Sequence, residues 1–132
     1  MLTIYLEVDV YFQGGILLQI LGTHLLLELR SCNPVLLTDL DYIEKSMVQI
    51  ALETGATIIG QSFHKFLPGG VTGVLAISES HISIHTWPEH KYAAVDIFTC
   101  NKKFISSKAA ELIINIMECQ DPDIREIKRG IF

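Results

Sequence analysis

Residues 79–90 hold an unusual concentration of reactive side chains. Ser80 follows the carboxylate of Glu79, another hydroxyl stands at Ser83, and three histidines occupy positions 81, 85 and 90. The segments on both sides are apolar and strand-like. Buried polar groups cost free energy unless they are paired, so a polar cluster within an apolar sheet requires a reason. We interpret that reason as chemical, with Ser80 as the reactive residue.

Two structural interpretations compete with this one. Taken alone, Ser80 is a serine at the edge of a strand. His81 and His85 share one face of an extended strand, with Ser83 between them, and could hold a metal ion. Two histidines without a third matching ligand are weak evidence for zinc, which prefers four ligands. We therefore expect no metal site.

The composition is that of one small domain that associates with other copies. A chain of 132 residues is a single domain by its length. Charged residues make up only 19% of it, so the chain can bury surface in a subunit interface, and we expect a homo-oligomer. A net charge of −5 without a basic stripe argues against nucleic acid as the main partner.

The cysteines and the apolar segments favour a cytoplasmic location. Cys32, Cys100 and Cys119 are an odd number without a CxxC pair, which fits a reducing cytosol better than a disulfide scaffold. We interpret Cys32 and Cys119 as structural. Residues 15–29 are apolar, but polar residues interrupt them and no basic residue precedes them. We expect neither a membrane span nor a signal peptide.

The elements that must position the reactive segment follow from the periodicity of apolar residues. Helices are expected over 35–54, stopped by Gly55, and over 108–118, capped by Ser106 or Ser107. Strands are expected at 2–10, 16–29, 57–65, 71–77, 81–87, 93–99 and 124–131, the last at a charged edge. This order predicts an α+β fold, a two-layer α/β sandwich whose mainly antiparallel sheet has two helices packed on one face. Residues 1–15 are either native or the remnant of a cleavable tag, and no function is assigned to them.

Two long motifs connect the reactive segment with a known family. They are ESHISIHTWPE at residues 79–89 and YAAVDIFTC at residues 92–100. Together they resemble the prokaryotic S-adenosylmethionine decarboxylase proenzymes, which depend on a pyruvoyl group. The resemblance continues through GTHLLLEL, SFHKF, GVTGV and the closing KRG, and covers about residues 20–132.

The resemblance implies that the chain cuts itself. The hydroxyl of Ser80 would attack the carbonyl of Glu79, and elimination followed by hydrolysis would leave pyruvoyl at residue 80. The products would be a chain of residues 1–79 and a chain of residues 80–132. His85 matches the proton acceptor of this processing, and a neutral imidazole suits that role. Positions 80 and 85 of a straight strand face opposite sides, so we expect a bend near Ser80.

The resemblance also implies residues for catalysis and substrate binding. Cys100 matches the proton donor that returns a proton to the α-carbon after CO2 leaves. Phe66 and Trp87 match aromatic positions near the adenosyl group, where a sulfonium over an aromatic face gains about 0.5–2 kcal/mol. Glu89 matches a carboxylate that accepts hydrogen bonds from ribose hydroxyls. Thr72 stands where the family usually has serine, and its hydroxyl implies a supporting role in processing or in substrate binding.

The resemblance implies decarboxylation of S-adenosylmethionine for spermidine synthesis, by a homodimer or a dimer of αβ heterodimers whose sites form at the subunit interface. The chain departs from the family at Thr23, where arginine is usual, and at the basic residues 101–104, where glycine and acidic residues are common. A pyruvoyl-dependent decarboxylase of ornithine or arginine therefore stays open as an alternative. A non-catalytic regulatory partner of a decarboxylase is the second alternative. The role of Glu28, within an apolar strand, is undecided.

Overall fold

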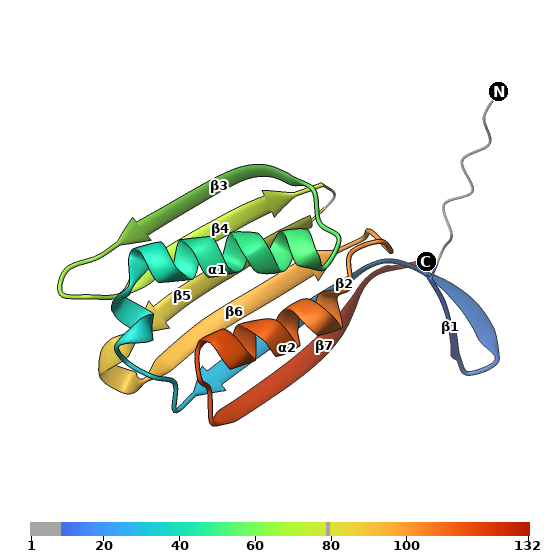
Figure 1. Ribbon diagram of the computed structural model, residues 1–132. Helices are drawn as coiled ribbons and strands as arrows, with labels where there is room; N and C mark the ends of the chain where they lie inside the picture. The colour runs from blue at the N-terminus through green and yellow to red at the C-terminus, as the bar shows by residue number, and fades with distance from the viewer. Residues whose placement is uncertain (1–8, 79) are drawn as a thin grey trace.

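The chain folds into two layers, a sheet of seven strands with two helices on one of its faces (Figure 1). The computed structural model describes residues 9–78 and 80–132. The helices are α1 (Leu40–Glu53) and α2 (Ser106–Ile116). The strands are β1 (Asp9–Gln13), β2 (Ile16–Arg30), β3 (Ile58–Lys65), β4 (Val71–Ile77), β5 (Ser80–Trp87), β6 (Tyr92–Thr99) and β7 (Asp121–Ile131). The predicted α+β sandwich is confirmed.

All pairs in the sheet are antiparallel, in the order β1-β2-β6-β5-β4-β3, with β7 beside β2. The β5–β6 hairpin is inserted between β4 and β2. Residues 80–132 thus supply three strands that pair with strands from residues 9–78 at several places. Two chains produced by a cut before residue 80 would still share one sheet.

The helices follow their apolar faces but begin differently from the sequence prediction. The predicted helix over 35–54 divides at Asp39, whose carboxylate accepts the backbone N–H of Tyr42 and caps α1. A short 3₁₀ helix, Leu36–Thr38, precedes it. Gly55 follows with a φ of 97°, which suits a glycine ending a helix. The predicted cap of α2 is wrong, because Ile105 occupies the cap position and no side chain caps this helix.

The ends of the chain also differ from the predicted strands. The strand expected at 2–10 lies largely outside the described residues, and β1 begins only at Asp9. Residues 14 and 15, both glycines with positive φ, form the turn into β2. The expected last strand is confirmed but starts earlier, at Asp121, and β2 is its partner.

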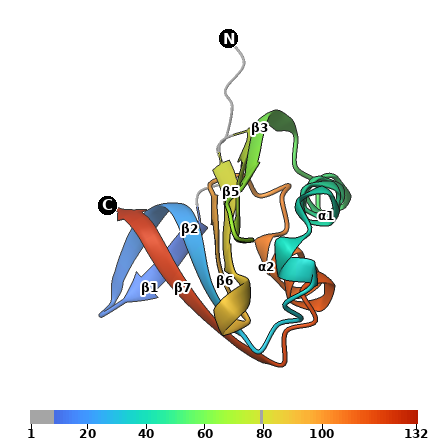
Figure 2. The ribbon, with the colours of Figure 1, turned by 90° about the vertical axis from the view of Figure 1, so that its left-hand side faces the viewer.

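Strand alternation produces one face against the helices and one face without helices (Figure 2). On β6, Ala93, Val95, Ile97 and Thr99 are buried beneath the helices, and the residues between them point to the other side. We call this other side the open face. It carries polar side chains from β2, β4, β5 and β6. Among the described residues, no helix is long and apolar enough to span a membrane.

Candidate active site

The predicted site residues fall into two groups at opposite ends of β5. The first group surrounds Ser80, which pairs with Thr99 of β6. The Ser80 hydroxyl donates a hydrogen bond to Thr99 Oγ1 over 3.0 Å. Thr99 is buried and is itself held by the backbone N–H of Asn101, 3.0 Å away. Thr99 therefore orients the Ser80 hydroxyl, a role that sequence analysis missed.

Cys100 belongs to the same group because it directly follows the residue that pairs with Ser80. It is exposed and lines a cavity of about 270 Å³ on the helix side of the sheet. Asn101, Lys102 and Phe104 also line this cavity. The departure from the family motif noted above thus lies at the wall of a cavity shared with the predicted proton donor. Glu79, the predicted cleavage residue, lies outside the described residues.

The second group lies at the other end of β5. His85, Phe66, Thr72, Trp87 and Glu89 all line one cavity of about 290 Å³. Four of them are the residues predicted to bind substrate, and the fifth is the predicted proton acceptor. They come from β4, from β5 and from the turns that follow β3 and β5. Residues that are far apart in the sequence therefore meet in a single cavity.

Polar and aromatic contacts order this second group. Thr72 Oγ1 and His85 Nδ1 form a hydrogen bond of 3.2 Å. The Trp87 ring stacks on Tyr92 with centroids 5.4 Å apart. Half of the Phe66 side chain and 40% of Trp87 are nevertheless exposed. Large aromatic surfaces next to an oriented imidazole provide a place for a ligand that combines an apolar ring with positive charge.

The two groups are far apart within one chain. β5 keeps its register with β4 and β6 from Ser80 to its end, so the predicted bend near Ser80 is wrong. Five positions of straight strand separate Ser80 from His85 by roughly 17 Å at about 3.3 Å per residue. The two side chains also face opposite sides of the sheet. His85 therefore does not reach Ser80 of its own chain.

A third cluster, on the open face, was not found from the sequence. Asp96 Oδ2 lies 2.8 Å from His24 Nε2 and 3.4 Å from His81 Nε2, and Ser83 donates to the other carboxylate oxygen. Burial raises the pKa of Asp96, but the hydrogen bonds from Ser83, His24 and His81 outweigh it and hold the pKa below its ordinary value. These residues lie on three adjacent strands, so no short spacing could reveal them.

This cluster is also the group of described residues that could hold a metal ion. The ligand atoms of His24, His81 and Asp96 lie within 4.8 Å of one another. The sequence analysis considered His81 together with His85 instead. In the structure His81 turns towards Asp96, and His85 pairs with Thr72.

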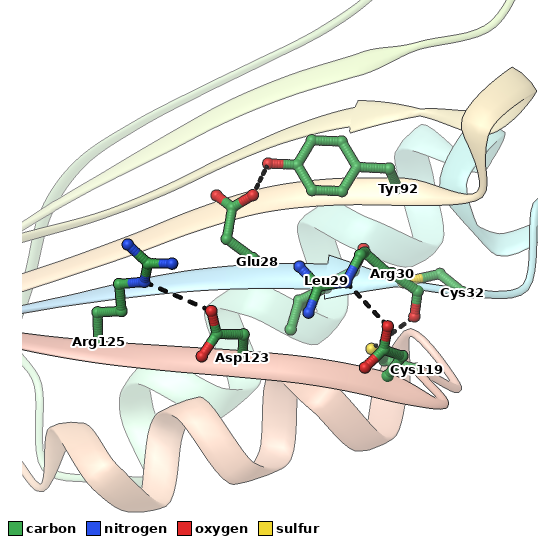
Figure 3. A network of polar contacts seen from close by, with 9 residues as sticks. Glu28, Leu29, Arg30, Cys32, Tyr92, Cys119, Asp123 and Arg125 are labelled. Carbon is green, nitrogen blue, oxygen red and sulfur yellow. Dashed lines mark hydrogen bonds and ion pairs between the residues drawn. The ribbon is translucent and has the colours of Figure 1, made fainter.

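A hydrogen bond on the neighbouring part of the open face explains how an apolar strand accommodates the Glu28 carboxylate (Figure 3). The Tyr92 hydroxyl donates to the Glu28 carboxylate over 2.7 Å. Burial, followed by this hydrogen bond to a carboxylate, raises the pKa of Tyr92 to about 12. Glu28 and His85 line a cavity of about 210 Å³ on this face together with Ser83 and Asp96. Glu28 thus lies beside the second group.

Comparison with known proteins places these observations in a family. The sequence model described as S-adenosylmethionine decarboxylase matches residues 23–130. The S-adenosylmethionine decarboxylase proenzyme of Thermodesulfovibrio yellowstonii is 51% identical over 111 residues, which cover 84% of this chain and 82% of that protein. The proenzyme of Thermosipho melanesiensis is 49% identical over 110 residues, covering 83% of this chain and 85% of that protein. The crystal structure of the Aquifex aeolicus adenosylmethionine decarboxylase superposes with a TM-score of 0.79 at 32% identity and covers 86% of this chain and 93% of that one.

Proposed function

The chain belongs to the S-adenosylmethionine decarboxylase family, and we propose that it is a self-processing enzyme that converts S-adenosylmethionine to decarboxylated S-adenosylmethionine and CO2. One observation carries the substrate assignment. The four residues predicted to bind substrate, Phe66, Thr72, Trp87 and Glu89, line a single cavity together with His85. Two exposed aromatic rings beside a carboxylate suit an adenine ring and ribose hydroxyls, groups that ornithine and arginine lack.

We propose that Ser80 becomes the pyruvoyl cofactor. Its Oγ attacks the Glu79 carbonyl, and the peptide becomes an ester. Removal of the α-proton of residue 80 then breaks the Oγ–Cβ bond and releases the Glu79 carboxylate. Hydrolysis of the remaining dehydroalanine gives pyruvoyl and ammonia. The contact with Thr99 supports this role. Thr99 Oγ1 accepts a hydrogen bond from the Ser80 hydroxyl, which directs a lone pair of the Ser80 oxygen away from β6.

His85 is proposed as the proton acceptor in processing. With its Nδ1 proton donated to Thr72 Oγ1, its Nε2 carries the lone pair that removes a proton. Thr72 is therefore a positioning residue that orients the imidazole ring. The distance within one chain requires that His85 act on another copy.

We propose that two copies complete each site. A two-fold pairing would place the His85 group of one copy beside the Ser80 group of its partner, because the groups lie at opposite ends of β5. After processing, each copy consists of residues 1–79 and 80–132, so the assembly is a dimer of αβ heterodimers. Exposed Phe66, Val74 and Trp87 provide apolar surface near the His85 group that this pairing would bury.

A pyruvoyl group at residue 80 would supply the electron sink that decarboxylation of an α-amino acid requires. The side chains of this chain then have defined tasks. Phe66 and Trp87 hold the sulfonium and adenine, and Glu89 accepts hydrogen bonds from the ribose. Cys100 holds the proton that the α-carbon receives after CO2 leaves. The product would serve spermidine synthesis in the cytoplasm.

The proposal is tested by mass and by turnover. The denatured protein should separate into two fragments that meet at Glu79 and residue 80, the second with pyruvoyl at its start. Ser80→Ala should remain one chain, and fragments of normal size from this variant would disprove the assignment. CO2 release should occur with S-adenosylmethionine. Turnover of ornithine or arginine, with no turnover of S-adenosylmethionine, would establish a decarboxylase of those amino acids instead. A wild-type protein that is uncut and inactive would favour a regulatory partner.

A further inference from the structure

Two cysteines lie opposite each other where β2 ends and β7 begins (Figure 3). The paired ladder closes with Arg30 opposite Asp121. Beyond it, Gln120 N–H donates to Ser31 O over 3.2 Å, which keeps the segments that carry Cys32 and Cys119 side by side. A second backbone hydrogen bond, from Asn33 N–H to Met117 O over 3.1 Å, joins the same two segments beyond the cysteines.

The side chains turn towards the same short stretch of β2. Cys32 Sγ donates to Leu29 O over 3.4 Å, and Cys119 Sγ donates to Arg30 O over 3.1 Å. The Cys119 thiol acts on Cys32 as a side-chain hydrogen-bond partner, so the two thiols are neighbours. Disulfides join residues whose Cα atoms lie about 4.4–6.8 Å apart. The bracketing backbone bonds therefore hold the two thiols within bonding reach.

We propose that Cys32 and Cys119 are a disulfide-forming pair, oxidised by low-molecular-weight disulfides, and that the bond joins the two chains of the processed protein. Cys32 belongs to residues 1–79 and Cys119 to residues 80–132, so the bond crosses the cleavage site. This second consequence rests on the proposed function. The pair itself does not.

The oxidation proceeds in two exchanges. The Cys119 thiolate attacks one sulfur of the small disulfide, breaks its S–S bond and releases one small thiol. The Cys32 thiolate then attacks the Cys119 sulfur and expels the second small thiol. The protein loses two electrons and two protons, and the small disulfide gains them. One S–S bond forms for each one broken.

Burial sets the order and the pH dependence of these steps. Cys119 is partly exposed, whereas only 3% of Cys32 is exposed, so the oxidant meets Cys119 first. Burial, followed by the neighbouring Cys119, raises the pKa of Cys32 to about 12. The second exchange should therefore accelerate about tenfold per pH unit between pH 7 and 10, as the thiolate fraction of Cys32 grows.

The experiment uses oxidised glutathione as the probe and intact mass under denaturing, non-reducing conditions. Oxidised wild type should appear as one species with the summed mass of both fragments, which a reductant separates. Uncut Ser80→Ala should become lighter by two hydrogen atoms and yield a linked peptide pair containing Cys32 and Cys119. Failure of the Ser80→Ala protein to lose two hydrogens at pH 10, where the second exchange is fast, would overturn the proposal.

Two variants serve as matched controls. Cys119→Ser changes a partly exposed residue and should abolish the link, whereas Cys100→Ser should retain it. Cys119→Ser is preferred to a change at buried Cys32, which risks the fold. A link that persists in Cys119→Ser would show that Cys119 is not the partner of Cys32. A wild type that stays one chain even in reductant, yet loses two hydrogens on oxidation, would contradict the proposed cleavage and leave the disulfide pair standing.

Discussion

Ser80 and His85 occupy the same strand, β5, but lie roughly 17 Å apart and on opposite faces of the sheet. The residue predicted to cut the chain and the residue predicted to assist it are therefore separated in the monomer. Each has its own neighbours, Thr99 and Cys100 for the serine, Thr72 and Trp87 for the histidine. Under the proposed function, this separation means that two copies are needed to complete a site.

Processing in trans can be tested by complementation. When Ser80→Ala and His85→Ala chains are co-expressed, the intact Ser80 of the His85→Ala chain meets an intact His85 on its partner. We expect the His85→Ala chains in mixed dimers to be cut and the Ser80→Ala chains to stay whole, as measured by intact mass. Each variant expressed alone is the control and should stay uncut. Efficient cutting of His85→Ala alone would show that His85 is dispensable.

Thr99→Val should slow processing without unfolding the protein. The change keeps the shape of the side chain but removes the acceptor of the Ser80 hydroxyl. Loss of a hydrogen bond worth about 1–3 kcal/mol corresponds to a processing rate about 5- to 160-fold lower, so fragments should still appear over time. Thr54→Val is the matched control, because Thr54 is a buried threonine bonded to Ile50 O away from the site. Equal rates in the two variants would remove Thr99 from processing.

Cys100→Ala should separate processing from turnover. Without the thiol, the α-carbon lacks its proton donor, so we expect cutting to continue while product formation falls about 10²- to 10⁴-fold. Fragment masses and the ratio of product to released CO2 measure the two effects. Cys119→Ser should keep wild-type turnover. A Cys100→Ala protein with full activity would exclude Cys100 as the acid.

Trp87→Ala should weaken substrate binding more than chemistry. Removing an aromatic face from the sulfonium costs about 0.5–2 kcal/mol, which raises KM for S-adenosylmethionine about two- to thirtyfold. Trp87→Phe retains a face and should restore most of the affinity. Ile105→Ala, which shortens an exposed apolar side chain elsewhere, is the control. An unchanged KM in Trp87→Ala would show that S-adenosylmethionine does not bind against this ring.

Asp96→Asn should destabilise the fold at neutral pH and less so in acid. Because the pKa of Asp96 is lowered on folding, its charged form contributes stability above its unfolded pKa of about 3.9 and loses that contribution as pH falls. We expect a loss of about 1–3 kcal/mol in unfolding free energy at pH 7, measured by denaturant titration. The difference from wild type should shrink below about pH 4.

Asp121→Asn is the matched control for this prediction. The pKa of Asp121 is also lowered, by its hydrogen bond and charge interaction with Arg30, but this pair is exposed to solvent. Exposed pairs contribute little because water screens them. An equal loss in the two variants would show that the three-strand cluster around Asp96 is no stronger than a surface ion pair.

Much of the secondary structure could be predicted from local patterns. The alternation of apolar residues at 93–99 and the helical spacing at 40–53 each record burial on one side, which is a local property of the chain. The motif around Ser80 identified the chemistry for the same reason, since its residues are neighbours in sequence. The cap of α2 failed because side-chain capping depends on backbone geometry that a nearby serine does not ensure.

By itself, the sequence predicted the two-layer fold. Through the family resemblance it also predicted a reactive serine and the functional residues that line the second cavity. Only the tertiary structure decided how far apart these groups lie, because register and strand direction place Ser80 and His85 at opposite ends of β5. It also decided which distant side chains meet. His24, His81 and Asp96 come together across three strands, and Cys32 lies near Cys119, since β2 pairs with segments of β6 and β7 that are about 65 to 110 residues further along the chain. Local propensity carries no information on such pairing, because it arises from the shared core and the hydrogen bonds of the whole sheet.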